Sequence, residues 1–144
     1  MASVEIALEQ WAKDLAAAYS AHDIEKALSF YADDCTFDDF ALGRFLNGKE
    51  EIRAHIREAF TAFPDFKIEI KSFFASGNHA CFECVMSGTH KGDLPRMPAS
   101  GKHFSVPGVV VVELKDGKAK READYYDGAS FMQQLGGLPS TPQK

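Results

Sequence analysis

The stretch that decides the fold is HFSVPGVVVVELKDGKAKREADYYDGASFMQQLG, residues 103–136. Its first part, residues 103–114, alternates apolar and polar side chains, which is the period-two pattern of a strand with one buried face. Asp116 and Gly117 form the Asp-Gly pair that is typical of a tight hairpin, and residues 119–126 supply the returning strand. The stretch therefore predicts two long antiparallel strands followed by a short helix.

The first part of the chain predicts helices. Apolar residues recur every three or four positions from Val4 to Tyr19, which places them on one helical face. Ser3 can cap this helix, which we expect to end near His22. Asp23 then begins a short second helix.

A third helix is predicted between Asn47 and Pro64. Glu50 lies three residues after Asn47, which is a capping-box-like start, and Pro64 stops the helix. From Phe66 the apolar period changes to two, and residues 79–90 form a second alternating run. Helices therefore come first and strands follow.

This order of elements is typical of the α+β class. We expect a curved mixed or antiparallel sheet wrapped around the N-terminal helices, so that the fold is a cone with an internal pocket. No repeat or linker interrupts residues 1–138, which predicts a single domain, and PSTPQK at 139–144 reads as a loose C-terminal tail. A chain of 144 residues is long enough to build a core and a pocket.

Composition excludes several classes of function. The net charge of −5 repels polyphosphates, so we expect no nucleic-acid partner. No apolar run approaches the roughly 20 residues that span a bilayer, so we expect no membrane association. Three cysteines without framework spacing, in a chain without a basic and apolar leader, favour the reducing cytoplasm. No metal-binding motif or glycine-rich phosphate loop is present in the sequence, so we expect chemistry that needs neither metal nor cofactor.

Two acidic residues near the end of the last predicted strand could serve chemistry or local scaffolding. Asp127 stands where the strand gives way to the closing helix, a place where a carboxylate caps free N–H groups. Asp124 lies within the strand, where aspartate is rare unless something specific uses it, and is therefore the catalytic candidate. Strict alternation instead puts Asp124 on a solvated face with Lys120 and Glu122. A β-bulge would reverse that assignment.

Other residues could share a pocket with Asp124. His90 falls on the apolar face of its predicted strand, where a histidine is as typical of a core residue as of a general acid. Asp38 and Asp39 must point in opposite directions in an extended segment, so one of them can face the interior. The remaining pocket candidates, which include possible hydrogen-bond donors, are Tyr19, Tyr31, Phe37, Asp39, Val110 and Tyr126.

Residues 88–139 resemble the SnoaL-like polyketide cyclases of the nuclear-transport-factor-2-like superfamily. The motifs that carry the resemblance are GTHKG at 88–92, MPASGK at 97–102, DGK at 116–118 and QLGGLP at 134–139. The helical half of the chain, with HDIEKALSFYADDCTFDD, is similar to the superfamily more loosely.

The resemblance implies a cone with a deep apolar pocket and a homodimer formed through the outer face of the sheet. In these cyclases an aspartate that aligns with Asp124 removes a proton next to a carbonyl and starts an aldol ring closure without a cofactor, and a second acidic residue aligns with Asp127. A pocket histidine of the cyclases aligns with Val110, so that partner is missing. The related ketosteroid isomerases place their base near Asp39, but their donors align near Leu15 and Val110, which disfavours steroid isomerisation.

The main hypothesis is a cofactor-free acid/base enzyme, a cyclase or isomerase. It would act on a lipophilic, carbonyl-bearing small molecule such as a polyketide, with Asp124 as base and His90 or a tyrosine as donor. The alternative is a non-catalytic domain that binds a small molecule or dimerises, motivated by Val110. A third hypothesis is opening of an epoxide by an aspartate paired with arginine, although Arg121 faces away from Asp124 on a regular strand.

Overall fold

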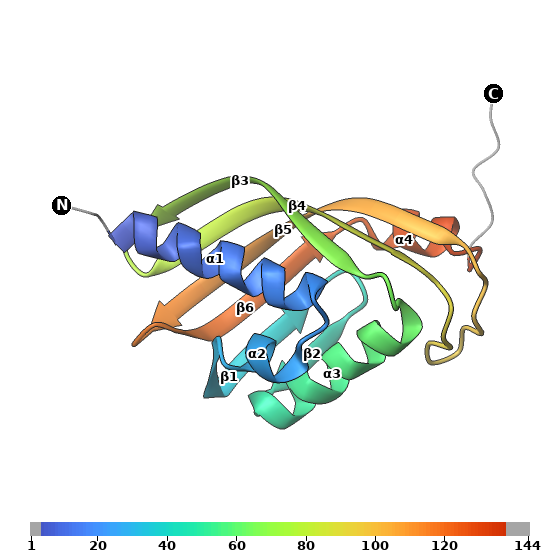
Figure 1. The fold of residues 1–144 in the computed structure, drawn as a ribbon, viewed down its shortest axis with the longest axis horizontal. Helices are drawn as coiled ribbons and strands as arrows, with labels where there is room; N and C mark the ends of the chain where they lie inside the picture. The colour runs from blue at the N-terminus through green and yellow to red at the C-terminus, as the bar shows by residue number, and fades with distance from the viewer. Residues whose placement is uncertain (1–3, 138–144) are drawn as a thin grey trace.

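The computed structural model describes residues 4–137 and confirms the α+β class (Figure 1). The predicted cap Ser3 and the predicted tail at 139–144 lie outside the described residues. Within the described part of the chain, no helix combines the length and the apolar character needed to cross a membrane.

Four helices are present in the described chain, three before residue 63 and one at the end. They are α1 (Val4–Ser20), α2 (Ile24–Leu28), α3 (Gly48–Ala62) and α4 (Gly128–Gln134). The predicted start of α3 is correct, but its capping differs from the expectation. Asn47 makes no side-chain cap bond, and Glu51 rather than Glu50 accepts a hydrogen bond from the Asn47 backbone N–H at 3.3 Å.

Six strands form one mixed sheet in the order β2-β1-β6-β5-β4-β3. They are β1 (Tyr31–Asp39), β2 (Arg44–Asn47), β3 (Lys67–Ser76), β4 (His79–Thr89), β5 (His103–Lys115) and β6 (Lys118–Tyr126). The pairing of β1 with β6 is parallel and the other neighbours are antiparallel. The sequence did not predict β2, because four residues are too few to display a period.

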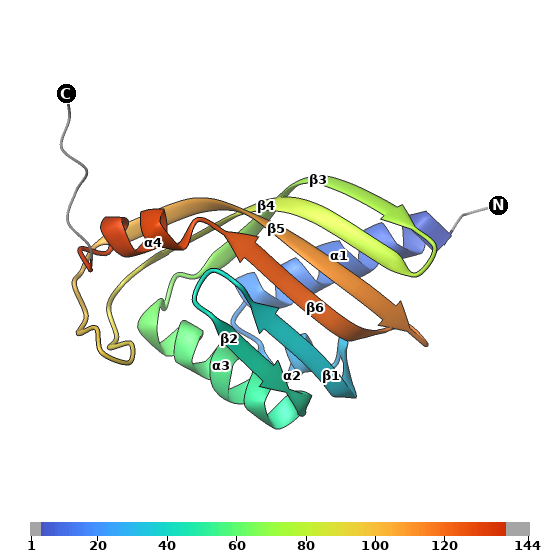
Figure 2. The same ribbon diagram turned by 180° about the vertical axis from the view of Figure 1, so that it is seen from behind.

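The helices α1 and α3 pack against the same face of the sheet, and α4 lies beside β5 (Figure 1). Seen from behind, the strands lie in front of α1 (Figure 2). The core between the two layers is apolar, and its fully buried side chains include Leu28, Ile52, Ile56, Val106 and Val112. The edge strands β2 and β3 do not pair with each other, so the sheet is open. The helices cover one of its two faces.

A β-bulge interrupts β6 at Lys120. On β5, Glu113 and Leu114 are neighbours, but their partners on β6 are Arg121 and Ala119, so Lys120 is the extra residue. A bulge of this kind reverses the alternation of side chains beyond it. Ala119, before the bulge, and Glu122, after it, are therefore both buried. Strict alternation would place these two positions on opposite faces of the sheet.

Three aromatic side chains meet on the outer side of the sheet. Tyr125 points away from its neighbour Asp124 and stacks on Phe40 with ring centroids 5.0 Å apart, and Phe45 meets Phe40 at 5.5 Å. All three are exposed. They lie on the face that the homodimer implied by the family resemblance would cover, and that homodimer stays a prediction.

Deleting Lys120 is expected to destabilise the protein by more than about 4 kcal/mol, the level that marks an exceptional mutation. The deletion removes the bulge, so one segment of β6 must turn its buried side chains towards solvent. Lys120→Ala keeps the backbone register and is the matched control, with an expected effect within about 0.5 kcal/mol. Urea unfolding measures both, and a deletion variant as stable as the control would contradict the role of the bulge.

Candidate functional site

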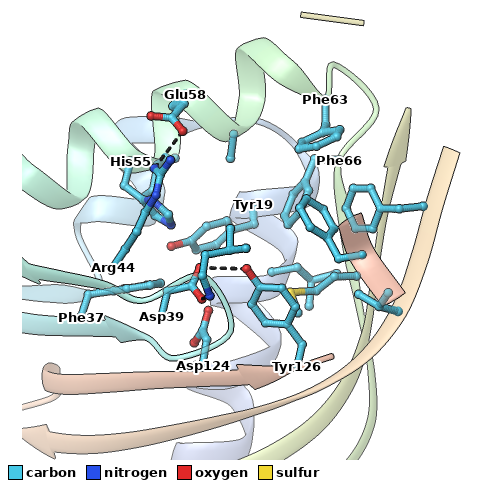
Figure 3. Close-up of a pocket in the computed structure, with 18 of the residues that line it drawn as sticks. Tyr19, Phe37, Asp39, Arg44, His55, Glu58, Phe63, Phe66, Asp124 and Tyr126 are labelled. Carbon is cyan, nitrogen blue, oxygen red and sulfur yellow. Dashed lines mark hydrogen bonds and ion pairs between the residues drawn. The ribbon is translucent and has the colours of Figure 1, made fainter. Parts of the chain in front are cut away.

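A cavity of about 370 Å³ lies between the inner face of the sheet and the helices α1 and α3 (Figure 3). This volume falls within the range of roughly 300–1,000 Å³ that is usual for small-molecule sites. Most of the wall is apolar, and its large side chains include Phe63, Phe66, Phe104, Phe131, Met97 and Met132. The cavity therefore suits a lipophilic molecule.

Three carboxyl groups reach the cavity from neighbouring strands. Glu122 and Asp124 come from β6. Asp39 comes from the end of β1, where it pairs in register with Asp124 (Figure 3). Asp39 accepts one hydrogen bond from the Tyr126 hydroxyl at 2.8 Å and another from the Leu42 backbone N–H at 3.0 Å. Both of its oxygens are therefore held in place. Across residues 4–137, no group of three histidine, cysteine or acidic side chains could hold a metal ion.

Two buried tyrosines connect Glu122 to α1. The Tyr31 hydroxyl donates to Glu122 Oε1 at 2.8 Å and lies 2.8 Å from the Tyr19 hydroxyl. Because the single proton of Tyr31 goes to Glu122, the Tyr19 hydroxyl donates in the second bond. Tyr19 and Glu122 line the cavity, and Tyr31 lies behind the wall between them. The chain of bonds fixes Glu122 against the core.

The carboxyl group of Asp124 has unused hydrogen-bonding capacity. Its Oδ1 atom is shielded from solvent and has no hydrogen-bond partner among residues 4–137. Burial, then the charge of Glu122, a hydrogen bond with Glu122 and the charge of Asp39, raise the pKa of Asp124 well above its usual range. Burial also raises the pKa of Glu122, against hydrogen bonds from Asp124 and Tyr31 that lower it. Both groups therefore hold a proton more tightly than exposed carboxyl groups do.

The polar side chains of Arg44, His55 and Glu58 line the cavity on the side of α3 (Figure 3). The Arg44 guanidinium pairs with Glu58 at 2.8 Å. His55 packs on the Phe37 ring at a centroid distance of 5.3 Å, and its Nδ1 atom is buried with no partner in the described chain. Burial lowers the pKa of His55, although the charge of Asp39 opposes this effect. His55 is therefore neutral at neutral pH and carries one ring N–H that can donate.

Most of the residues proposed from sequence reach the cavity. Its wall includes Tyr19, Phe37, Asp39, Val110, Asp124 and Tyr126. His90 is not part of it, which corrects the expectation that His90 acts beside Asp124. The strand β4 ends at Thr89, so the face-sharing argument does not extend to His90. Its buried ring instead lies 3.1 Å from the Ser100 hydroxyl through Nδ1 and packs near Phe63.

Three further positions bear on the alternative functions. Leu15 and Val110 line the cavity, and neither side chain carries a hydrogen-bond donor. An enolate oxygen near them would find no stabilisation from these two positions. Arg121 pairs with Asp38 at 3.6 Å and does not line the cavity, so it is not a partner for Asp124 in epoxide opening.

Sequence reasoning missed Glu122 and His55. Strict alternation placed Glu122 in water with Lys120, but the bulge turns it inward. No sequence signal for that bulge is apparent. His55 could have been noticed, because it lies three residues after Ile52 and one before Ile56, next to the buried stripe of α3.

Comparison with known proteins gives one family match. The family model of the SnoaL-like polyketide cyclases matches residues 9–135. A search of curated protein sequences finds no significant match.

Solved structures similar to this chain share its fold. One is a protein with a ketosteroid isomerase-like fold from Catenulispora acidiphila DSM 44928, in complex with trimethylamine. Its sequence is 25% identical, its TM-score is 0.78, and the match covers 92% of this chain and 97% of that chain. TsrD from Streptomyces laurentii is also 25% identical, with a TM-score of 0.81 and the same coverage of 92% and 97%. A SnoaL-like protein from Jannaschia sp. CCS1 is 17% identical, with a TM-score of 0.85 and coverage of 96% and 98%, which shows the fold alone.

Asp124→Asn is expected to stabilise the protein at neutral and alkaline pH. The pKa of Asp124 is raised in the folded state. The folded protein therefore keeps a proton that the unfolded chain releases above about pH 4. As a result, the free energy of unfolding falls as pH rises from about 4 towards the folded pKa. Each unit of elevation corresponds to about 1.4 kcal/mol. Asparagine removes this dependence.

Urea unfolding of the native protein and the variant at about pH 4 and about pH 8 checks the expectation, the lower value being close to the unperturbed aspartate pKa. The advantage of the variant should be larger at the higher pH. The same difference at both values would contradict a raised pKa.

Proposed function

Because the chain belongs to the SnoaL-like polyketide cyclase family, we propose that it is a cofactor-free acid/base enzyme, a cyclase or isomerase. It removes a proton next to a carbonyl group of a lipophilic small molecule such as a polyketide. The size and apolar wall of the cavity support a substrate of this class. We expect it to work in the cytoplasm as a homodimer.

The observation that carries the proposal is the position of Asp124. Its shielded Oδ1 atom, without a partner in the described chain, belongs to a side chain that lines an apolar cavity. A buried acceptor without a partner is costly, and such groups concentrate at functional sites. The raised pKa of Asp124 also moves its proton affinity towards that of a useful base at neutral pH.

In the proposed reaction the substrate binds with its carbonyl at the polar end of the cavity. Asp124 takes the proton from the carbon next to the carbonyl, and the electron pair of the broken C–H bond forms an enolate. In a cyclase, the enolate carbon attacks a second carbonyl of the same molecule, and the resulting alkoxide takes up a proton. In an isomerase, the proton returns to another carbon of the enolate system.

The developing oxyanion needs a hydrogen-bond donor. Tyr126 and Tyr19 already donate to Asp39 and Tyr31, so their hydroxyl protons are engaged. His55 is neutral, lines the cavity and has a ring nitrogen that no described residue occupies. We assign the donor role to His55, in place of His90.

Asp124→Asn should lower the rate of proton abstraction by about 100-fold or more, because the general base is lost. The reaction can be followed without the natural substrate, as exchange of the proton next to the carbonyl of lipophilic ketones in D₂O, measured by NMR. Asp38→Asn is the matched control, since Asp38 pairs with Arg121 and does not line the cavity. Full activity of Asp124→Asn would end the proposal.

The alternative is a domain of the same fold that binds a small molecule without chemistry. It is favoured by Leu15 and Val110, which place apolar side chains in the cavity wall where the related enzymes carry donors. Tight binding of aromatic ketones by the native protein, without exchange or product at any pH, would support this alternative. Retained binding by Asp124→Asn together with lost exchange would support the enzyme.

A further inference from the structure

Glu122 is buried in a place where the proposed reaction has given it no task. Its carboxyl group receives the Tyr31 hydroxyl at 2.8 Å, and Tyr31 is in turn joined to Tyr19. Asp124 is two residues further along the same strand, and both side chains line the cavity. The two carboxyl groups are close enough for a hydrogen bond. A run of hydrogen bonds therefore leads from α1 to Asp124.

The surroundings favour a single negative charge on the two acids together. Both lie in a largely apolar enclosure, and two adjacent carboxylates cannot both be ionised there at low cost. Of the two arginines that line the cavity, Arg44 and Arg96, Arg44 is paired with Glu58. One proton shared between Glu122 and Asp124 removes the repulsion and gives each acid a hydrogen bond.

We propose that Glu122 and Asp124 act as one base, in which Asp124 receives the substrate proton on Oδ1 and passes its own proton to Glu122. Glu122 is thus a positioning residue that makes a neutral Asp124 basic, and Tyr31 holds its carboxylate in place. This inference rests on the proposed function, because it assigns the path of the proton in that reaction.

The step balances without an added reagent. The C–H bond of the substrate breaks, its electron pair remains as the enolate, and the proton forms an O–H bond at Asp124 Oδ1. The proton on the other oxygen of Asp124 moves to Glu122. The pair changes from one negative charge to none while the substrate gains one, so the total charge of the site is constant.

The pKa directions agree with this arrangement. Burial raises the pKa of both acids, and the charge of Glu122 raises that of Asp124 further. The other titratable groups that interact with the pair are Asp39, Cys35 and Tyr31 on β1, Tyr126 on β6, Cys84 on β4 and Tyr19 on α1. Burial raises the pKa of Tyr19 and Tyr31, and it raises the pKa of the Cys35 and Cys84 thiols to about 12, so these four groups stay neutral near pH 7.

The first test needs no substrate. Infrared difference spectra between the native protein and Asp124→Asn at neutral pH should contain the C=O stretch of a protonated carboxylic acid. In Glu122→Gln that band should disappear at a lower pH, because the neighbouring charge is gone. Glu113→Gln, which removes a carboxylate from β5 outside the cavity, is the control and should leave the band unchanged.

The second test uses the exchange reaction. The native pH–rate profile should be bell-shaped, since only the singly protonated pair is active. Glu122→Gln should lose the alkaline limb and react about tenfold or more slowly at neutral pH, whereas Glu122→Asp should keep the bell shape. Tyr31→Phe should lower the rate and keep the band.

The outcomes separate the two proposals. A band without exchange on any ketone would leave the shared proton in place and overturn the proposed function. Exchange that depends on Asp124, with no band in the native protein or with the same profile in Glu122→Gln, would overturn the shared base alone.

Discussion

One extra residue in β6 decides which side chains of that strand reach the interior. Lys120 takes up the additional position, so Ala119 stays in the core and Glu122, Asp124 and Tyr126 all face the helices. The parallel partner β1 then brings Asp39 into register with Asp124. The acidic end of the cavity is thus a product of strand pairing on both sides of β6, and each of its carboxyl groups depends on that register.

Burying these carboxyl groups opposes folding, because each loses its hydration. Tyrosine hydroxyls replace part of the lost water, since Tyr31 donates to Glu122 and Tyr126 donates to Asp39. Asp124 Oδ1 lacks such a donor in the described chain, and the proton that we propose it shares with Glu122 lowers the cost of burying the pair. Removing this acid would therefore add stability, and a trade-off of this kind is usual where a protein uses a buried acid for function.

One end of the cavity is apolar and the other is polar. The rings of Phe63, Phe66 and Phe131 form part of the apolar wall. Asp124 from β6 and His55 from α3 lie at the polar end, together with Asp39 (Figure 3). A molecule with a lipophilic skeleton and a carbonyl satisfies both ends at once. The rings also exclude water, which strengthens each electrostatic interaction at the polar end.

Local patterns in the sequence determined the α+β class, the hairpin at Asp116 and most helix and strand limits, because hydrophobic period and turn chemistry are read within a few neighbouring residues. Asp124 was found in the same way, since an aspartate is out of place in a strand, and through resemblance to a family. Only the tertiary structure decided that Glu122 and His55 face the cavity and that His90 does not. Pairing between strands set the bulge in β6 and the end of β4, and the packing of α3 against the sheet turned His55 inward. Such contacts join residues far apart in the chain, so no local pattern records them.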